Sequence, residues 1–140
     1  MTQTIETFRG VVYPWHIDHI GHMNVQFYTA RFDEATWHFL ASLGITATYL
    51  REAGRGMVAV EQKTLYKREL LAGDLIVITS ELLQMTAKSV RFLHRMIHAE
   101  SGAEAASTEL VGVHIDTALR KSTPFPPSIF VESAPGAANV

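Results

Sequence analysis

The stretch NVQFYTARFDEATWHFLASLG, residues 24–44, decides the fold that we predict for this chain. Its apolar side chains recur at steps of three or four, the period of one helix face: Tyr28, Phe32, Ala35, Phe39 and Leu43. Asn24 is a favourable N-cap, because its side-chain oxygen can accept a hydrogen bond from an amide of the first turn. The pattern therefore predicts an amphipathic helix of about five turns that ends at Gly44.

After this helix the hydrophobic period changes to two. TATYLREA (46–53) is expected to add a short helical turn first. Four strand-like segments follow, at residues 57–67, 74–84, 88–99 and 104–119, and the short turns AGD, MTA and ESG separate them. Connections this short predict an antiparallel meander.

The flanking segments complete the predicted domain. IETFRGVVYPW (5–15) is typical of a first strand that runs into a loop, and the prolines of KSTPFPP (121–127) should end the last strand, since proline cannot donate to a ladder. A long helix beside four long strands needs a sheet that wraps it, so we predict an α+β domain with one helix on a curved antiparallel sheet. We expect a single domain over 1–130 and a flexible C-terminal tail over 131–140.

Composition and charge restrict the function. The 140 residues are 47% hydrophobic and 19% charged, an ordinary globular balance. A net charge of -2 gives no basic footprint, so nucleic acid is not an expected partner. With no signal-peptide pattern and no apolar run long enough to cross a membrane, we expect a cytoplasmic protein without a membrane partner. The absence of cysteine excludes disulfides, thiolate zinc sites and cysteine nucleophiles.

The loop before the helix, WHIDHIGHMNV (15–25), concentrates the chemistry. His16, His19 and His22 could be metal ligands, because histidine is the commonest side chain to bind a metal. Steps of three place ligands on one face only in a helix, however, and a proline and a glycine flank or interrupt this run. The spacing therefore argues against metal, which stays a minor alternative, and we expect no cofactor.

Asp18 is the second candidate in this loop. It lies about six residues before the helix, close enough to fold back across a helix end whose amides and dipole attract negative charge. Such amides could polarise a carbonyl while the carboxylate attacks it or activates a water molecule. An aspartate that only caps a turn fits the same spacing, so spacing alone does not decide.

The segment PWHIDHIGHMNVQFYTARFDEA, followed by VAVEQKTLYKRELLAGDLIVITSEL, resembles the hotdog-fold acyl-CoA thioesterases of the 4-hydroxybenzoyl-CoA thioesterase type. That family's motif is D-x-D-x-x-G-H-x-N-N, then an aromatic residue and a helix bearing F-[DE]-[EA]-A. The matching positions are Asp18, Gly21, His22, Asn24, Tyr28 and the run FDEA at 32–35. The similarity covers roughly residues 8–127, and it implies a hotdog fold, a curved antiparallel sheet wrapped around one long central helix.

The resemblance also implies a function. Asp18 would be the catalytic carboxylate of an acyl-CoA thioesterase, acting as nucleophile or as general base on water. Amides at the helix start near Asn24 and Val25 would polarise the thioester carbonyl, and Gly21 and His22 would orient the loop. The substrate would be an acyl-CoA, and the protein a homodimer or a dimer of dimers with its active sites at a subunit interface.

Three positions depart from the family pattern. His16 stands at the first acidic position, Val25 at the second asparagine, and Glu69 where a proline often follows the second strand. We therefore treat three side chains as candidates for the acyl pocket or for tuning the aspartate: His16, His19 and Tyr28. Histidine-rich loops also occur in thioesterases for short or charged acyl groups such as betainyl-CoA, which is an analogy and does not identify the acyl group.

Two rival functions remain open. One is a non-catalytic hotdog module that binds an acyl-CoA or acyl-carrier thioester. The other is a hydratase of the same fold, which usually carries a different arrangement of histidine and aspartate. Six basic residues on the predicted strands could meet the CoA phosphates or form a solvated face: Lys63, Lys67, Arg68, Lys88, Arg91 and Arg95.

Overall fold

The computed structural model describes residues 3–129. The secondary-structure elements follow in the order β1 (Thr4–Val11), the 3-10 helix η1 (Pro14–His16), α1 (Val25–Ser42), α2 (Ala47–Ala53), β2 (Arg55–Tyr66), β3 (Leu75–Met85), β4 (Ser89–His98), β5 (Glu104–Asp116) and β6 (Lys121–Ser122). The tail that we predicted for 131–140 lies outside the described residues.

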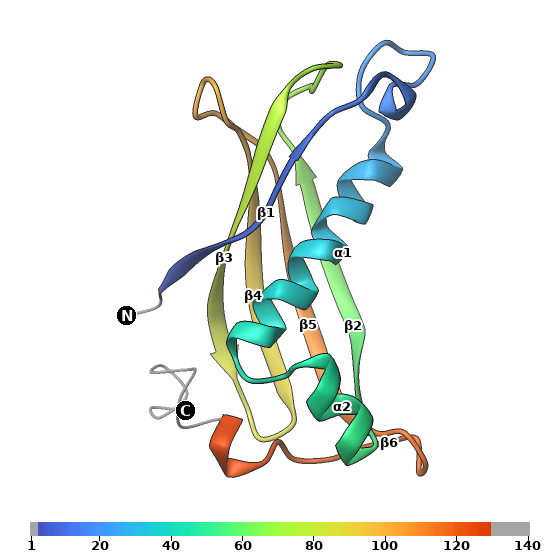
Figure 1. Cartoon of the computed structure of the whole chain (residues 1–140), viewed down its shortest axis with the longest axis vertical. Helices are drawn as coiled ribbons and strands as arrows, with labels where there is room; N and C mark the ends of the chain where they lie inside the picture. Colours follow the sequence, from blue (N-terminus) through green and yellow to red (C-terminus); the bar gives the residue numbers. More distant parts are fainter. Residues whose placement is uncertain (1–2, 130–140) are drawn as a thin grey trace.

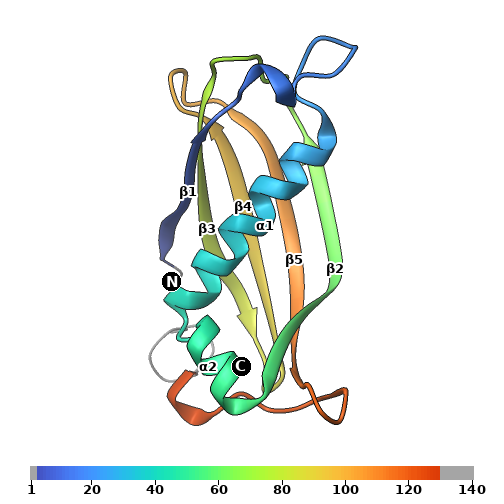
Figure 2. The ribbon, with the colours of Figure 1, turned by 45° about the vertical axis from the view of Figure 1, so that its right-hand side comes forward.

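The strands form one antiparallel sheet that curls around α1, which crosses its concave face (Figures 1 and 2). The strand order is β1-β3-β4-β5-β2, and β6 pairs with β5 beside the end of this path. The loop between η1 and α1 lies at one end of the sheet, whereas α2 and β6 lie at the other (Figure 1). This arrangement is the predicted α+β architecture, a curved antiparallel sheet wrapped around one long helix.

The central helix confirms the sequence prediction most closely. Asn24 is its N-cap, with the side-chain oxygen accepting from the Gln26 amide at 3.0 Å. The buried face consists of Tyr28, Phe32, Ala35, Phe39 and Leu40. Gly44 follows the helix with a φ of 91°, a backbone conformation that glycine adopts without a steric cost.

The predicted meander is only partly correct. β3, β4 and β5 do follow one another as neighbours, but β2 pairs with β5 along the far edge of the sheet rather than with β3. The connection from β2 to β3 is residues 67–74, and it is longer than the turn AGD on which the prediction rested. Those residues run across one end of the sheet, past β4 and β5, while α1 lies over the concave face (Figure 2).

Two strand ends also differ from the prediction. β1 ends at Val11, earlier than the predicted boundary, because η1 begins at Pro14. The strand predicted over 104–119 ends at Asp116, whose carboxylate accepts from the amides of Ala118 and Leu119 at 2.9 Å each and so closes a turn. After this turn Lys121 and Ser122 pair back with β5 as the short strand β6.

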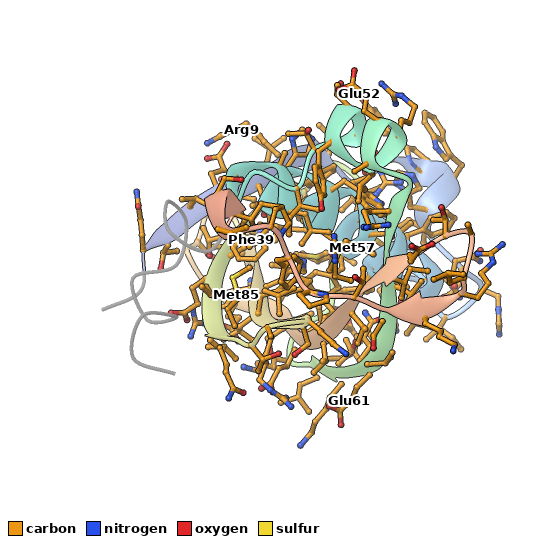
Figure 3. The ribbon with its side chains drawn as sticks, turned by 90° about the horizontal axis from the view of Figure 1, so that it is seen from below. Arg9, Phe39, Glu52, Met57, Glu61 and Met85 are labelled. Carbon is orange, nitrogen blue, oxygen red and sulfur yellow. The ribbon has the colours of Figure 1, made fainter. Side chains whose placement is uncertain are left out.

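The core lies between α1 and the concave face of the sheet. One cluster surrounds the C-terminal half of the helix, with Phe39 and Met85 among its members, and a second surrounds the N-terminal half, with Phe32 and Met96. Figure 3 shows Phe39 and Met85 in the interior and Glu52 at the periphery. None of the helices between residues 3 and 129 combines the length and apolar character needed to span a bilayer.

Candidate active site

The loop before α1 is a tight, internally bonded turn. Ile17 and Met23 form an antiparallel bridge, and the Asp18 amide donates to the His22 carbonyl oxygen at 3.1 Å. Gly21 then donates its amide to the Asp18 carbonyl oxygen at 3.0 Å, with a φ of 103° that favours glycine. The backbone of residues 17–23 thus fixes where the Asp18 side chain begins.

The Asp18 carboxylate is held from two directions. Oδ2 accepts from the side-chain amide of Asn24 at 2.9 Å, and Oδ1 accepts from the backbone amide of Ile20 at 2.9 Å. The Asn24 hydrogen bond is the main reason that the pKa of Asp18 lies below its ordinary value, and the Ile20 bond and the charges of His22 and His19 lower this pKa further. The carboxylate is therefore ionised at neutral pH and keeps lone pairs for a further contact.

Asn24 joins this carboxylate to the helix end. The Asn24 side chain donates to Asp18 through Nδ2 and accepts from the Gln26 amide through Oδ1. The backbone carbonyl oxygen of Asn24 accepts from the Phe27 amide at 3.0 Å. The Val25 amide belongs to the first helical turn, where amides have no partner within the helix. An ionised carboxylate and an amide at the positive end of a helix dipole consequently lie on either side of one asparagine.

Two backbone hydrogen bonds attach the loop to the rest of the domain. Asn24 donates its amide to the His16 carbonyl oxygen at 2.9 Å, which ties the helix start to η1. Met23 donates to the Leu70 carbonyl oxygen at 2.8 Å, which ties it to the connection between β2 and β3. The candidate site is thereby positioned by η1, which directly precedes the loop, and by a connection that is distant in the sequence.

The three histidines of the loop do not converge. His16 is buried, its Nδ1 accepts from the Tyr13 amide at 3.0 Å, and burial lowers its pKa. His19 is exposed, whereas His22 Nε2 lies 3.8 Å from Glu69 Oε2. Across residues 3–129 no three histidine or carboxylate side chains gather in a way that could hold a metal ion.

A cleft of about 330 Å³ opens beside the helix start, between α1 and the segment that follows β2. His22 and Val25 contribute to one wall, and Tyr66, Lys67 and Arg68 to the other. Asp18 does not line the cleft. His22, whose carbonyl oxygen accepts from the Asp18 amide, does line it, and so does Val25, which follows the N-cap Asn24. The cleft thus combines a helix N-terminus with the charged side chains of Lys67, Arg68 and Glu69.

Tyr28 lies at the floor of this cleft. Its hydroxyl donates to the Arg68 carbonyl oxygen at 3.2 Å, and its ring meets the Tyr66 ring edge to face at 5.2 Å. Burial raises its pKa, so the phenol is neutral at ordinary pH. Tyr28 therefore shapes the cleft and braces its opposite wall.

The segment after β2 is the part of the site that the sequence did not identify. Glu69 and Leu70 approach the loop through the connection of residues 67–74, Tyr66 at the end of β2 lines the cleft, and no local motif marks them. The one sequence feature that pointed to this connection was Glu69, which departs from the family pattern. Its carboxylate lies 3.8 Å from Nε2 of the motif residue His22. Lys67 pairs with Glu104, and Arg91 and Arg95 also pair with strand carboxylates, which fits the interpretation of the strand cations as a largely solvated face.

A curved antiparallel sheet around one helix, with a carboxylate loop at the helix N-terminus, defines the hotdog class of thioesterase-like proteins. Residues 12–131 match the thioesterase-like superfamily, and the chain belongs to that family. The match spans most of the chain, and it confirms the family resemblance that we drew from the loop motif and the helix.

Two curated relatives carry the name L-carnitine dehydrogenase/betainyl-CoA thioesterase. The chain is 29% identical over 119 residues to the one from Rhizobium meliloti (strain 1021), and 31% identical over 113 residues to the one from Agrobacterium fabrum (strain C58 / ATCC 33970). These alignments cover 85% and 81% of this chain but 24% and 23% of the relatives. The chain therefore spans about a quarter of their length.

Solved structures share the fold. A hypothetical protein from Staphylococcus aureus, solved in complex with CoA, superposes with a TM-score of 0.85 at 24% identity. The superposition covers 92% of this chain and 80% of that protein. At this level of identity the similarity supports the fold alone.

Proposed function

We propose that this chain is an acyl-CoA thioesterase that hydrolyses its substrate to a free acid and CoA, with Asp18 as the catalytic carboxylate. The observation that carries the proposal is the Asn24 side chain, which bonds the Asp18 carboxylate and the first helical turn at once. A carboxylate and a helix end held together in this way suit attack on a carbonyl.

Two routes fit this geometry. In the first, an Asp18 oxygen attacks the thioester carbon, the CoA thiolate leaves, and water then hydrolyses the mixed anhydride. In the second, Asp18 takes a proton from a water molecule that attacks the same carbon, and the thiolate again leaves. In both routes the Val25 amide would donate to the carbonyl oxygen as negative charge develops, a contact typically worth about 3 kcal/mol.

The charges around the cleft support CoA as the leaving group. Arg68 lines the wall opposite the helix start, beside Glu69 and beside Lys67, whose ammonium pairs with Glu104, and a helix N-terminus favours anions. The structural neighbour from Staphylococcus aureus was solved with CoA, and the curated relatives are named for a CoA thioester. We therefore assign the nucleotide part of the substrate to the wall of the cleft that carries Arg68.

A homodimer is part of the proposal, since β2 is an exposed edge strand. Within the described residues β2 pairs with β5 alone, and its apolar side chains Val60, Leu65 and Tyr66 are 61%, 50% and 50% exposed. Long apolar edge strands seldom stay open to solvent in native proteins. A second copy that pairs along β2 would cover them and would form a further wall beside the cleft.

Thiol release from a panel of acyl-CoA thioesters tests the proposed function. We expect turnover on at least one acyl-CoA, with free CoA and free acid formed in equal amounts. Tight binding of acyl-CoA by calorimetry without turnover on any member would favour the non-catalytic module instead. Addition of water across an enoyl-CoA double bond, followed by its absorbance, would favour a hydratase.

A further inference from the structure

A second hollow lies along the same seam between α1 and β2, further along the helix from the loop than the cleft. It has a volume of about 150 Å³ and an apolar lining from Phe32, Leu40, Met57, Phe92 and Leu110. Thr36 and Asp33 are among the few polar side chains in its wall. An apolar cavity of this size holds a group as large as a benzene ring.

The cavity continues the face of the helix that begins at the candidate site. Val25 lines the cleft, and Thr29, one turn further along, lines the cavity. The two residues are four apart, so they share a helix face and are separated by about 6 Å along the axis. A thioester whose carbonyl meets the Val25 amide can therefore direct its acyl tail past Thr29 into the apolar space.

We infer that this cavity binds the apolar tail of the acyl group, and that Met57 and Gly112 limit the bulk that it accepts. The inference rests on the proposed function and adds a substrate class to it: acyl groups with an apolar tail long enough to pass one helical turn. Acyl groups with an anionic tail are disfavoured, because the one charged side chain in this wall is the Asp33 carboxylate and an unpaired buried charge is costly.

Gly112 is the position where one methyl group would narrow the cavity. It lies on β5 opposite Ala59, and both residues belong to the cavity wall. A Cβ built at Gly112 would lie 3.2 Å from Met57 Cε and 3.7 Å from Val90 Cγ1. Alanine at this position therefore pushes the flexible end of Met57, which lies toward the middle of the molecule in Figure 3, into the remaining space.

The chain offers a matched control for this substitution. Gly56 is also a strand glycine, on β2, and its added Cβ would meet Ile115 Cγ1 and Thr117 Cγ2 at 3.4 Å. Gly56 is not part of the cavity wall. Gly56→Ala thus adds the same methyl group to the sheet without changing the cavity, and Met57→Ala enlarges the cavity instead of filling it.

The test compares kcat/KM for acetyl-, butyryl-, hexanoyl-, octanoyl-, decanoyl-, phenylacetyl- and succinyl-CoA among these three variants and the wild type. For Gly112→Ala we expect octanoyl- and phenylacetyl-CoA to lose about tenfold relative to butyryl-CoA, the effect of a methylene-sized change in an apolar pocket. Met57→Ala should shift the preference toward bulkier tails, and Gly56→Ala should leave the wild-type profile unchanged.

Binding of an octanoyl-CoA thioether, which cannot be hydrolysed, gives a readout that does not depend on turnover. We expect it to bind the wild type more tightly than CoA does, and Gly112→Ala to lose that difference. Equal profiles and equal binding in Gly112→Ala and Gly56→Ala would overturn the inference while leaving the hydrolysis intact. Preferred hydrolysis of succinyl-CoA, whose tail is anionic, would overturn it as well, whereas a lack of turnover on every substrate would contradict the proposed function only.

Discussion

Asn24 Nδ2 donates to Asp18 Oδ2 at 2.9 Å, while the carbonyl oxygen of the same Asn24 side chain caps helix α1. One residue therefore fixes the carboxylate, lowers its pKa and begins the helix whose first amides face the cleft. The loop and the helix are consequently connected through one side chain. The residue that positions the Asp18 carboxylate is also the N-cap that stabilises the helix.

Replacing Asn24 by serine should separate these two roles. Serine is an equally good N-cap, so the helix keeps its start, but it has no amide to donate to Asp18. Because the Asn24 bond is the largest influence that lowers the pKa of Asp18, this pKa should rise toward its ordinary value. The acid limb of the pH profile of kcat/KM should then move to higher pH, so that activity is lost earlier as the pH falls.

The capping contribution has its own control. Asn24→Ala removes donor and cap together and should show the same shift of the acid limb, with about 1 kcal/mol less stability in urea unfolding. Thr46→Ala removes the N-cap of α2, where the side chain accepts from Tyr49, and should cost similar stability without moving the limb. An acid limb that stays fixed in both Asn24 variants would show that this asparagine does not tune the catalytic carboxylate.

Most of the fold could be predicted from periodicity. The helix of residues 24–44, its asparagine cap and its glycine stop were all visible as local patterns, and the long strands appeared as alternation. The position of β2 at the far edge of the sheet could not be predicted. A strand's neighbour is decided by how the sheet packs around α1 rather than by the strand's own residues. Short apparent turns can also belong to longer connections, as residues 67–74 show.

The site was predictable only where it is local. Asp18, Gly21, His22 and Asn24 lie within seven residues and occur in one motif, so the loop could be found without a structure. The contribution of Glu69 and Leu70 required the crossing connection to bring them to the loop. The position of His16 beneath Phe27, with ring centroids 4.7 Å apart, likewise depends on burial that no spacing rule encodes.

A buried histidine should make the stability of this domain fall in mild acid. His94 is fully buried on β4, its Nδ1 lies 2.5 Å from Ser80 Oγ, its Nε2 lies 2.9 Å from Thr36 Oγ1, and burial lowers its pKa to about 3. Below the unfolded-state pKa near 6.5, the unfolded chain binds a proton that the folded chain does not. Stability should therefore decrease as the pH falls from about 6.5 toward about 3.

Urea unfolding at pH 7 and pH 5 measures this contribution. The loss of unfolding free energy between the two should be smaller in His94→Gln than in the wild type by about 2 kcal/mol. His38→Gln, which changes an exposed histidine on α1, should keep the wild-type loss. The same pH dependence in His94→Gln as in the wild type would mean that His94 does not titrate on unfolding.

The exposed edge of β2 should support a dimer. Val60→Lys combined with Leu65→Lys places two charges on this strand, and we expect a dimer in the wild type and a monomer in the double variant by sedimentation velocity. Leu119→Lys is the matched control, because Leu119 is 69% exposed in the turn between β5 and β6, and this variant should remain dimeric. Unchanged sedimentation of the double variant would assign the subunit contact to another surface.

The central claim is that Asp18 performs the chemistry. It is tested most directly by kcat of Asp18→Asn on the best acyl-CoA substrate, beside the wild type and Glu52→Gln, which changes an exposed carboxylate on α2. We predict that kcat falls by at least about a hundredfold in Asp18→Asn, in a variant that is still folded at the assay temperature, and stays at the wild-type value in Glu52→Gln. A folded Asp18→Asn protein with wild-type kcat would contradict the account.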